Sequence, residues 1–196
     1  MSGDEIIAFI VCLLIAIFTW GFWIFAALAN RNFRPSPSAY LLPWLAAPLS
    51  AALLFGILAR YASHDVRDDA LYLAFYLVMG GAVAAVAVMI LDRLGLSLRD
   101  DVIERRNPAA CLAWSGALVG LVLAYAGANI GDGPGWWVVV YCSGLSVGSL
   151  LLGWLLLDRF GQVGEAIVVE RDGSSGARVA GWFIGAGLIL GRGAAG

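Results

Sequence analysis

The sequence predicts an all-α integral membrane protein with about six transmembrane helices, arranged as parallel two-helix hairpin repeats. Three observations predict this fold class: long apolar blocks, arginines gathered in alternate loops, and a charged stretch that occurs twice. Of the 196 residues, 61% are hydrophobic, and the mean hydropathy is +0.86. A soluble domain is usually about 45–50% apolar. A helix that crosses a bilayer needs roughly 20 consecutive apolar residues, and about six blocks of the chain approach that length.

The predicted spans follow one another with short polar links between them. They cover residues 6–28, 39–58, 70–91, 108–126, 136–157 and 174–190. In the second span, Pro48 lies deep enough to kink the helix. Asn107 and Pro108 open the fourth span, because Asn is a favoured N-cap and Pro is tolerated at the first helical position. We expect Ser174 or Ser175 to cap the sixth span.

The distribution of arginine sets the predicted orientation, because cytoplasmic loops carry an excess of basic residues. The loops after the first, third and fifth spans, with the start of the sixth span, hold Arg31, Arg34, Arg93, Arg99, Arg105, Arg106, Arg159, Arg171 and Arg178. The opposite side holds Arg60, Arg67 and Arg192. We therefore expect the first set in the cytoplasm and both termini on the outer, periplasmic side of a bacterial inner membrane.

A charged stretch recurs after 66 residues. Leu91-Asp92-Arg93-Leu94-Gly95 returns as Leu157-Asp158-Arg159-Phe160-Gly161, and Ile103-Glu104-Arg105 returns as Val169-Glu170-Arg171 at the same offset. Each copy joins two spans, and an even number of spans per unit makes the repeats parallel. The predicted division is an N-terminal hairpin (1–62), a first repeat (70–128) and a second repeat (135–193). The N-terminal hairpin is either a third, shorter copy or a separate element.

Glycines spaced four residues apart mark candidate packing faces. The pairs are Gly116 and Gly120, Gly144 and Gly148, and Gly181 and Gly185. Such spacing puts the small residues on one face of a helix and lets two backbones approach closely. We expect tight packing within the chain or a seam between copies in a homo-oligomer; a mobile pore wall is the alternative.

Part of the first repeat resembles a known family. The segment Ile103-Glu104-Arg105-Arg106-Asn107-Pro108-Ala109-Ala110, followed by Leu112-Ala113-Trp114-Ser115-Gly116-Ala117-Leu118-Val119-Gly120, is similar to the repeat signature of the YjfL-like inner-membrane proteins, domain of unknown function 350. In the second copy, Gly173 takes the place of the Asn and Ser174-Ser175-Gly176 that of Pro-Ala-Ala. The resemblance covers about residues 70–193. It implies a multi-pass bacterial inner-membrane protein of unassigned activity, associated with envelope maintenance.

The charged loops hold the candidate site residues. These are Glu104, Arg105, Arg106, Asn107, Glu170 and Arg171, with Arg178 about one turn inside the sixth span. They either fix the orientation and bind anionic headgroups of membrane lipids, or form a docking face for a peripheral cytoplasmic protein. Arg178 is shallow enough to extend back to the headgroups.

Two functions remain open from the sequence. The first is a non-enzymatic scaffold whose charged cytoplasmic loops hold lipids or a peripheral partner. The second is a small oligomeric channel or transporter for cations or polyamines. It is suggested by the parallel repeat, by the serines Ser143, Ser146 and Ser149, and by the outer acids Asp65, Asp68, Asp69 and Asp132. Catalytic motifs, metal-ligand spacings and phosphate loops are absent from the sequence, so we expect no enzyme and no cofactor. The net charge of −2 gives no basic surface for nucleic acid.

Overall fold

The computed structural model describes residues 1–29, 41–131 and 135–195, which are almost entirely helical. The elements are α1 (Gly3–Ala29), α2 (Leu41–Tyr61), α3 (His64–Arg67), α4 (Ala70–Arg93), the π-helical segment η2 (Leu98–Glu104), α5 (Pro108–Gly127), α6 (Trp136–Gly161), α7 (Val163–Val168) and α8 (Gly173–Ala194). The predicted all-α class is confirmed, and each predicted span falls on one long helix. Arg31, Arg34 and Asp132, which entered the predictions above, lie outside the described residues.

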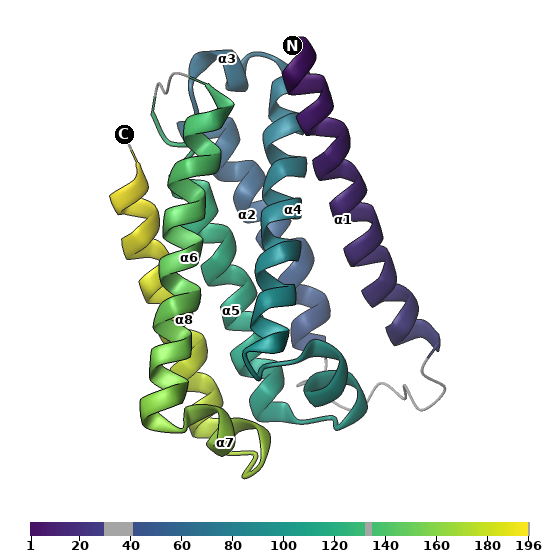
Figure 1. Ribbon diagram of the computed structural model, residues 1–196, viewed down its shortest axis with the longest axis vertical. Helices are drawn as coiled ribbons and strands as arrows, with labels where there is room; N and C mark the ends of the chain where they lie inside the picture. Colours follow the sequence, from purple (N-terminus) through teal and green to yellow (C-terminus); the bar gives the residue numbers. More distant parts are fainter. Residues whose placement is uncertain (30–40, 132–134, 196) are drawn as a thin grey trace.

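The long helices run side by side between two ends of the molecule (Figure 1). The N-terminus and α3 lie at one end, and η2 and α7 lie at the other. The two charged connectors, residues 94–107 and 162–172, therefore lie at the same end, which we call the connector end. Seven of the arginines assigned to one side belong to described residues at or near this end. Arg60, Arg67 and Arg192 belong to the opposite end.

Five of the described helices, α1, α2, α4, α5 and α6, are long and apolar enough to cross a membrane. Many large apolar side chains are exposed on their outer faces, among them Phe18, Leu45 and Leu145. Apolar surface of this extent suits lipid rather than water, and it marks the chain as a membrane protein. The sixth long helix, α8, does not meet the same criterion of length and apolarity. Its first turns carry Ser174, Ser175 and Arg178.

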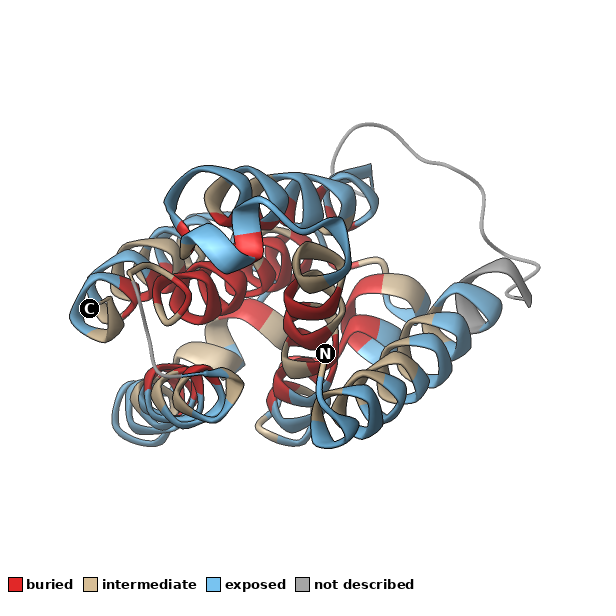
Figure 2. Cartoon of the chain, turned by 90° about the horizontal axis from the view of Figure 1, so that it is seen from above, coloured by how far each residue is buried: buried red, intermediate tan, exposed pale blue. Residues whose placement is uncertain are grey.

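α5 lies at the centre of the bundle, where Figure 2 shows most of the buried residues. It contacts α2, α4, α6 and α8, and its packing against α8 is the most extensive between any two described elements. α1 packs chiefly on α4 and also contacts η2, so it lies at the edge of the bundle. α1 and α2, the predicted hairpin 1–62, thus contact other helices more extensively than they contact each other.

Glycines allow the close approach of α5 to α8. They are Gly116, Gly120 and Gly127 on α5, and Gly176, Gly187 and Gly191 on α8. A β-carbon at any of them would overlap backbone atoms of the opposite helix. Gly176 lies against Ala109 near the start of α5, and Gly191 lies against Gly127 at its end, so the two helices run parallel. This interface joins the predicted hairpins 70–128 and 135–193 more extensively than either is packed internally.

Local side chains fix where the helices begin. Asn107 is the N-cap of α5, with Pro108 as its first residue, as the sequence predicts. The expectation that a serine caps α8 is wrong: Asp172 is the N-cap, and it accepts from the backbone N–H groups of Ser174 and Ser175. Both serine hydroxyls also donate to its carboxylate. The aspartate is preferred because a charged acceptor binds helix N–H groups more strongly than a hydroxyl does. At Pro48, where the sequence predicts a kink, α2 remains one continuous helix.

Candidate functional site

The two connectors end with the same hydrogen bond. In the first, the backbone N–H of Asn107 donates to the carbonyl of Asp101, at 3.0 Å. In the second, the backbone N–H of Asp172 donates to the carbonyl of Ala166, at 2.9 Å. Each bond reaches back six residues, from the N-cap of a long helix to a short helix. A left-handed residue at the end of a helix turns the chain so that a following N–H can bond back to a helix carbonyl, and here the bond reaches one residue further than in the Schellman motif.

That left-handed residue is an arginine in both connectors. Arg106 has a φ of 49° and Arg171 a φ of 56°, and each comes immediately before an N-cap. Arg106 therefore corresponds to Arg171, at a spacing of 65 residues rather than 66. The sequence match pairs Glu104-Arg105 with Glu170-Arg171, whereas the backbone conformation pairs Arg106 with Arg171, so the two alignments differ by one residue. The first connector is one residue longer between its Asp-Arg pair and its cap.

Asn107 holds the two connectors together. Its side chain is completely buried. Its Oδ1 accepts from the backbone N–H groups of Ala109 (3.0 Å) and Ala110 (3.2 Å), which caps α5. Its Nδ2 donates to the carbonyls of Ile167 (2.7 Å) and Val168 (3.3 Å) at the end of α7. One amide thus forms hydrogen bonds with the backbone N–H groups at the start of α5 and with the backbone carbonyls at the end of α7.

The first connector contains a buried carboxylate, Asp101. Its Oδ2 accepts from the backbone N–H of Ser97 (2.9 Å), and its Oδ1 accepts from Nη1 of Arg105 (3.2 Å). Burial raises the pKa of Asp101 above the ordinary value, and the bonds from Ser97 and Arg105 partly oppose that rise. Arg105 is therefore both a partner of a buried group and, with 57% of its side chain exposed, a surface residue.

The remaining candidate residues lie on the surface of the connector end. Glu104 is half exposed and forms an ion pair with Nε of Arg99 (3.0 Å). Arg171 is exposed, and its Nη2 lies 3.4 Å from the carbonyl of Arg105, which makes a second link between the connectors. Glu170 and Arg178 are also exposed. We call the exposed charged residues of this surface the connector face: Glu104, Arg105, Arg159, Glu165, Glu170, Arg171 and Arg178.

The glycine pairs take different places in the structure. Gly116 and Gly120 face α8 across the close contact described above. The pair Gly144 and Gly148 on α6, and the pair Gly181 and Gly185 on α8, have open space beside them within this chain. The spacing of 65 residues that relates the connectors also relates Gly116 to Gly181 and Gly120 to Gly185. The two related pairs therefore lie in different surroundings.

Sequence reasoning missed the role of Ser97 and Asp101. The Ser97 hydroxyl accepts from the backbone N–H of Asp100 (3.1 Å), while Asp101 accepts from the N–H of Ser97. This reciprocal arrangement resembles a capping box, in which a Ser and a following acid satisfy each other's backbone groups. A serine followed by Asp100 three residues later was a readable signal of a helix start.

The residues suggested for a polar path do not share one face. Ser143 and Ser146 are buried, and they donate to the carbonyls of Val140 (3.2 Å) and Cys142 (2.9 Å) of their own helix. Ser149 is exposed. Serines bonded in this way to their own helix pack as small residues.

Comparison with known proteins identifies a family. A search of curated proteins found no match, and a search of solved structures found none either. The family model described as Domain of Unknown Function (DUF350) matches residues 42–193, from the first turn of α2 to the last turn of α8. The match contains both connectors, and it extends further toward the N-terminus than the resemblance found at residues 70–193. The chain therefore belongs to the DUF350 family.

Proposed function

We propose that the protein is a non-enzymatic scaffold of the bacterial inner membrane that docks a peripheral protein on its connector face. One observation carries this proposal: the buried amide of Asn107 joins two charged connectors, distant in the sequence, into a single surface. Arg171 adds a second link through the carbonyl of Arg105. Charged side chains on one fixed surface can match a partner, because recognition depends on holding groups in a set geometry.

The charges of the connector face favour an acidic partner. Its arginines are Arg105, Arg159, Arg171 and Arg178, and its acids are Glu104, Glu165 and Glu170. Glu104 is already paired with Arg99, and Arg105 with the buried Asp101, which leaves three arginines and two glutamates. The face therefore has an excess of positive charge, which would steer an acidic protein segment toward it.

A matched pair of substitutions tests this docking. Arg178→Glu reverses one charge on the connector face, and Arg192→Glu makes the same change on an exposed arginine at the other end of the same helix. Proteins that co-purify with the wild-type chain from native membranes should be lost with Arg178→Glu and kept with Arg192→Glu. If both variants recover the same proteins in the same amounts as wild type, docking on the connector face is wrong.

The orientation in the proposal places the connector face in the cytoplasm, in line with the excess of arginine at that end. Glu170 and Asp65 are exposed at opposite ends of the bundle. With cysteines introduced singly at these positions, a membrane-impermeant maleimide added to intact spheroplasts should label only Asp65→Cys. Labelling of Glu170→Cys instead would reverse the orientation. The unsubstituted chain controls for Cys12, Cys111 and Cys142.

The proposed scaffold is a homo-oligomer in which α6 contacts a second copy. Gly144 and Gly148 leave the backbone of this helix uncovered within one chain, and close helix contacts in lipid favour such positions. Gly144→Leu with Gly148→Leu should lower the mass of the detergent-solubilised complex. An unchanged mass would place the interface elsewhere.

The alternative, a channel for cations or polyamines, has less support from the described residues. Four cavities, whose linings include Met89, Leu54, Asn129 and Met79 respectively, share no lining residue. The central helix α5 is mostly buried by its neighbours. Flux of potassium or spermidine into liposomes containing the purified protein, above that of empty liposomes, would favour the channel over the scaffold.

A further inference from the structure

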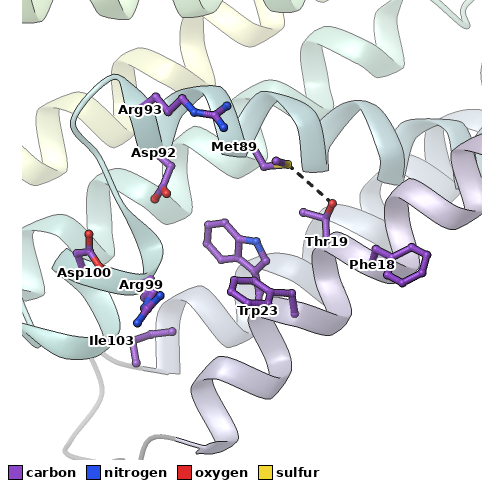
Figure 3. A pocket seen from close by; sticks show the side chains of 10 residues that line it. Phe18, Thr19, Trp23, Met89, Asp92, Arg93, Arg99, Asp100 and Ile103 are labelled. Carbon is purple, nitrogen blue, oxygen red and sulfur yellow. Dashed lines mark hydrogen bonds between the residues drawn. The ribbon is translucent and has the colours of Figure 1, made fainter.

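A cleft of about 420 Å³ opens at the connector end between α1, α4 and η2. Figure 3 shows side chains from all three elements around it, including Trp23 from α1, Met89 and Asp92 from α4, and Arg99 from η2. The cleft forms where α1 and α4, which lie together near the N-terminus, separate toward the connector end (Figure 1). The Thr19 hydroxyl, 3.9 Å from the sulfur of Met89, joins the two helices at its edge.

The cleft has one apolar and one charged side. Phe18 and Phe22 line it from α1, and these side chains are 72% and 58% exposed on the surface that faces lipid. The charged residues are Asp92, Arg93, Arg99 and Asp100, at the end of α4 and the start of η2. An apolar wall that continues into a cluster of charges at a helix end matches the boundary between acyl chains and headgroups.

Asp92 is the unusual member of this cluster. Its Oδ1 is buried and has no hydrogen-bond partner among the described residues. In the second repeat, Oδ1 of the matching Asp158 accepts from the backbone N–H of Gly164, at 2.7 Å. The difference follows from the connectors. α7 begins shortly after Asp158, whereas η2 begins later and is capped by its own Ser97. A buried carboxylate oxygen without a donor is costly, so a donor from a bound molecule would be stabilising.

The charged residues of the cleft indicate the chemical class of the molecule that could bind there. Two aspartates and two arginines give the cleft a formal charge of zero, which suits a zwitterion better than a polycation or a polyanion. Arg99 uses Nε to bind Glu104, which leaves its terminal nitrogens for another acceptor. Arg93 takes part in no ion pair given by the described residues. Arginine donors suit a phosphate, and a carboxylate acceptor suits an ammonium group.

We propose that this cleft binds phosphatidylethanolamine. Its primary ammonium would donate to the carboxylate of Asp92, its phosphate would accept from Arg93 and Arg99, and an acyl chain would lie along Phe18, Phe22 and Met89. A choline headgroup has no N–H to donate to Asp92, and a glycerol headgroup has no cation. The site is separate from partner docking, because it uses none of the residues of the connector face.

Native mass spectrometry of the delipidated, purified chain tests the proposal. Lipids are added one at a time: phosphatidylethanolamine, its N-methylated series, phosphatidylcholine and phosphatidylglycerol. Phosphatidylethanolamine should bind about tenfold more tightly than phosphatidylcholine, because only it gives Asp92 a hydrogen-bond donor of full strength. Affinity should fall sharply at the fully methylated headgroup. Equal binding of the two zwitterionic lipids, or tightest binding of phosphatidylglycerol, would overturn the proposal.

Two variants separate the site from the fold. Asp92→Asn should abolish the preference for phosphatidylethanolamine, and Asp158→Asn should keep it, because Asp158 is used within the second connector. Without lipid, Asp92→Asn should unfold at the same temperature as wild type or higher, since Oδ1 of Asp92 has no hydrogen bond within the described residues to lose. A preference that survives in Asp92→Asn contradicts the assignment, as does displacement of the lipid by spermidine. Loss of docking in Arg178→Glu leaves this result unaffected.

Discussion

Substitutions of Asn107 should separate two roles of its side chain: it caps α5, and it donates a hydrogen bond to the carbonyl of Ile167. Asn107→Ala removes the cap of α5, a loss of about 1 kcal/mol. It also leaves the buried carbonyl of Ile167 without its donor at 2.7 Å, which costs about 1–3 kcal/mol more. We therefore expect Asn107→Ala to lower the free energy of unfolding by about 2–4 kcal/mol.

Asn107→Asp tests the second role alone. Aspartate caps a helix as well as asparagine does, so the N–H groups of Ala109 and Ala110 keep their acceptor. It cannot donate to Ile167, and it places negative charge beside that carbonyl. The loss should be about 1–3 kcal/mol, and it should appear at the second connector rather than in α5.

Unfolding by SDS in mixed micelles measures the free energies, and amide hydrogen exchange locates the change. In Asn107→Asp, exchange should rise in residues 163–172 and stay slow at the start of α5. The control is Asp172→Ala, which removes a cap that bonds only to the first turn of its own helix, at Ser174 and Ser175. If Asn107→Asp is as stable as wild type, or if Asn107→Ala costs no more than Asp172→Ala, the link between connectors is not significant.

Two further predictions concern packing and protonation. Gly120→Ala should destabilise by about 1–3 kcal/mol, because its β-carbon would meet the backbone of α8. Gly181→Ala should be neutral or stabilising by up to about 1 kcal/mol, because space is open beside it. SDS unfolding of both variants measures the difference, and equal effects would refute the close contact. The pKa of Asp101 is raised by burial, so the folded chain holds this proton more tightly than the unfolded chain and stability falls as pH rises from about 4 through the raised pKa. The pKa of Asp172 is lowered by bonds from Ser175 and Ser174, so its contribution is present above about pH 4 and lost on acidification. Asp101→Asn and Asp172→Asn should therefore change the pH dependence of unfolding in opposite directions, and changes of the same sign would contradict this assignment.

The helices could be predicted well from the sequence because their causes are local or depend on simple composition. Apolar blocks long enough for a bilayer fall on α1, α2, α4, α5 and α6. The start of α5 was predicted to the residue because Asn107 and Pro108 act on the backbone beside them. At α8 the sequence predicts a serine cap, but Asp172 lies just before both serines and is the stronger acceptor, so the helix begins there.

The sequence does not predict which face of each helix packs against its neighbour. Glycine spacing marks a face on a helix, but which face meets a neighbour depends on how the helix is rotated in the bundle. Gly116 and Gly120 face α8, whereas Gly181 and Gly185, at related positions, do not. On α8 the contact uses Gly187 and other small residues on another side of the helix. α5 and α8 therefore meet through non-equivalent faces, because the related pair Gly181 and Gly185 is rotated away from α5.

The sites at the connector end also depend on the lengths of the two connectors, which differ although their Asp-Arg motifs match. Asp92 and Asp158 match in the sequence, yet one extra residue in the first connector moves the start of the following short helix away from Asp92. Asp158 therefore accepts a hydrogen bond from Gly164 of its own connector, whereas Asp92 lines a cleft and has one buried oxygen without a donor among the described residues. A short insertion between two matching motifs has in this way produced one structural carboxylate and one available for a ligand.

The family match adds a constraint on where each proposed site should occur. Both connectors lie within residues 42–193, so a docking face built by Asn107 is available to any family member that has the same two connectors. The cleft is different, because Phe18, Phe22 and Trp23 belong to α1, which precedes the matched region. Phosphatidylethanolamine binding should therefore require both Asp92 and a helix in the position of α1. Partner docking should require neither, so a chain that retained the connectors without α1 would separate the two activities.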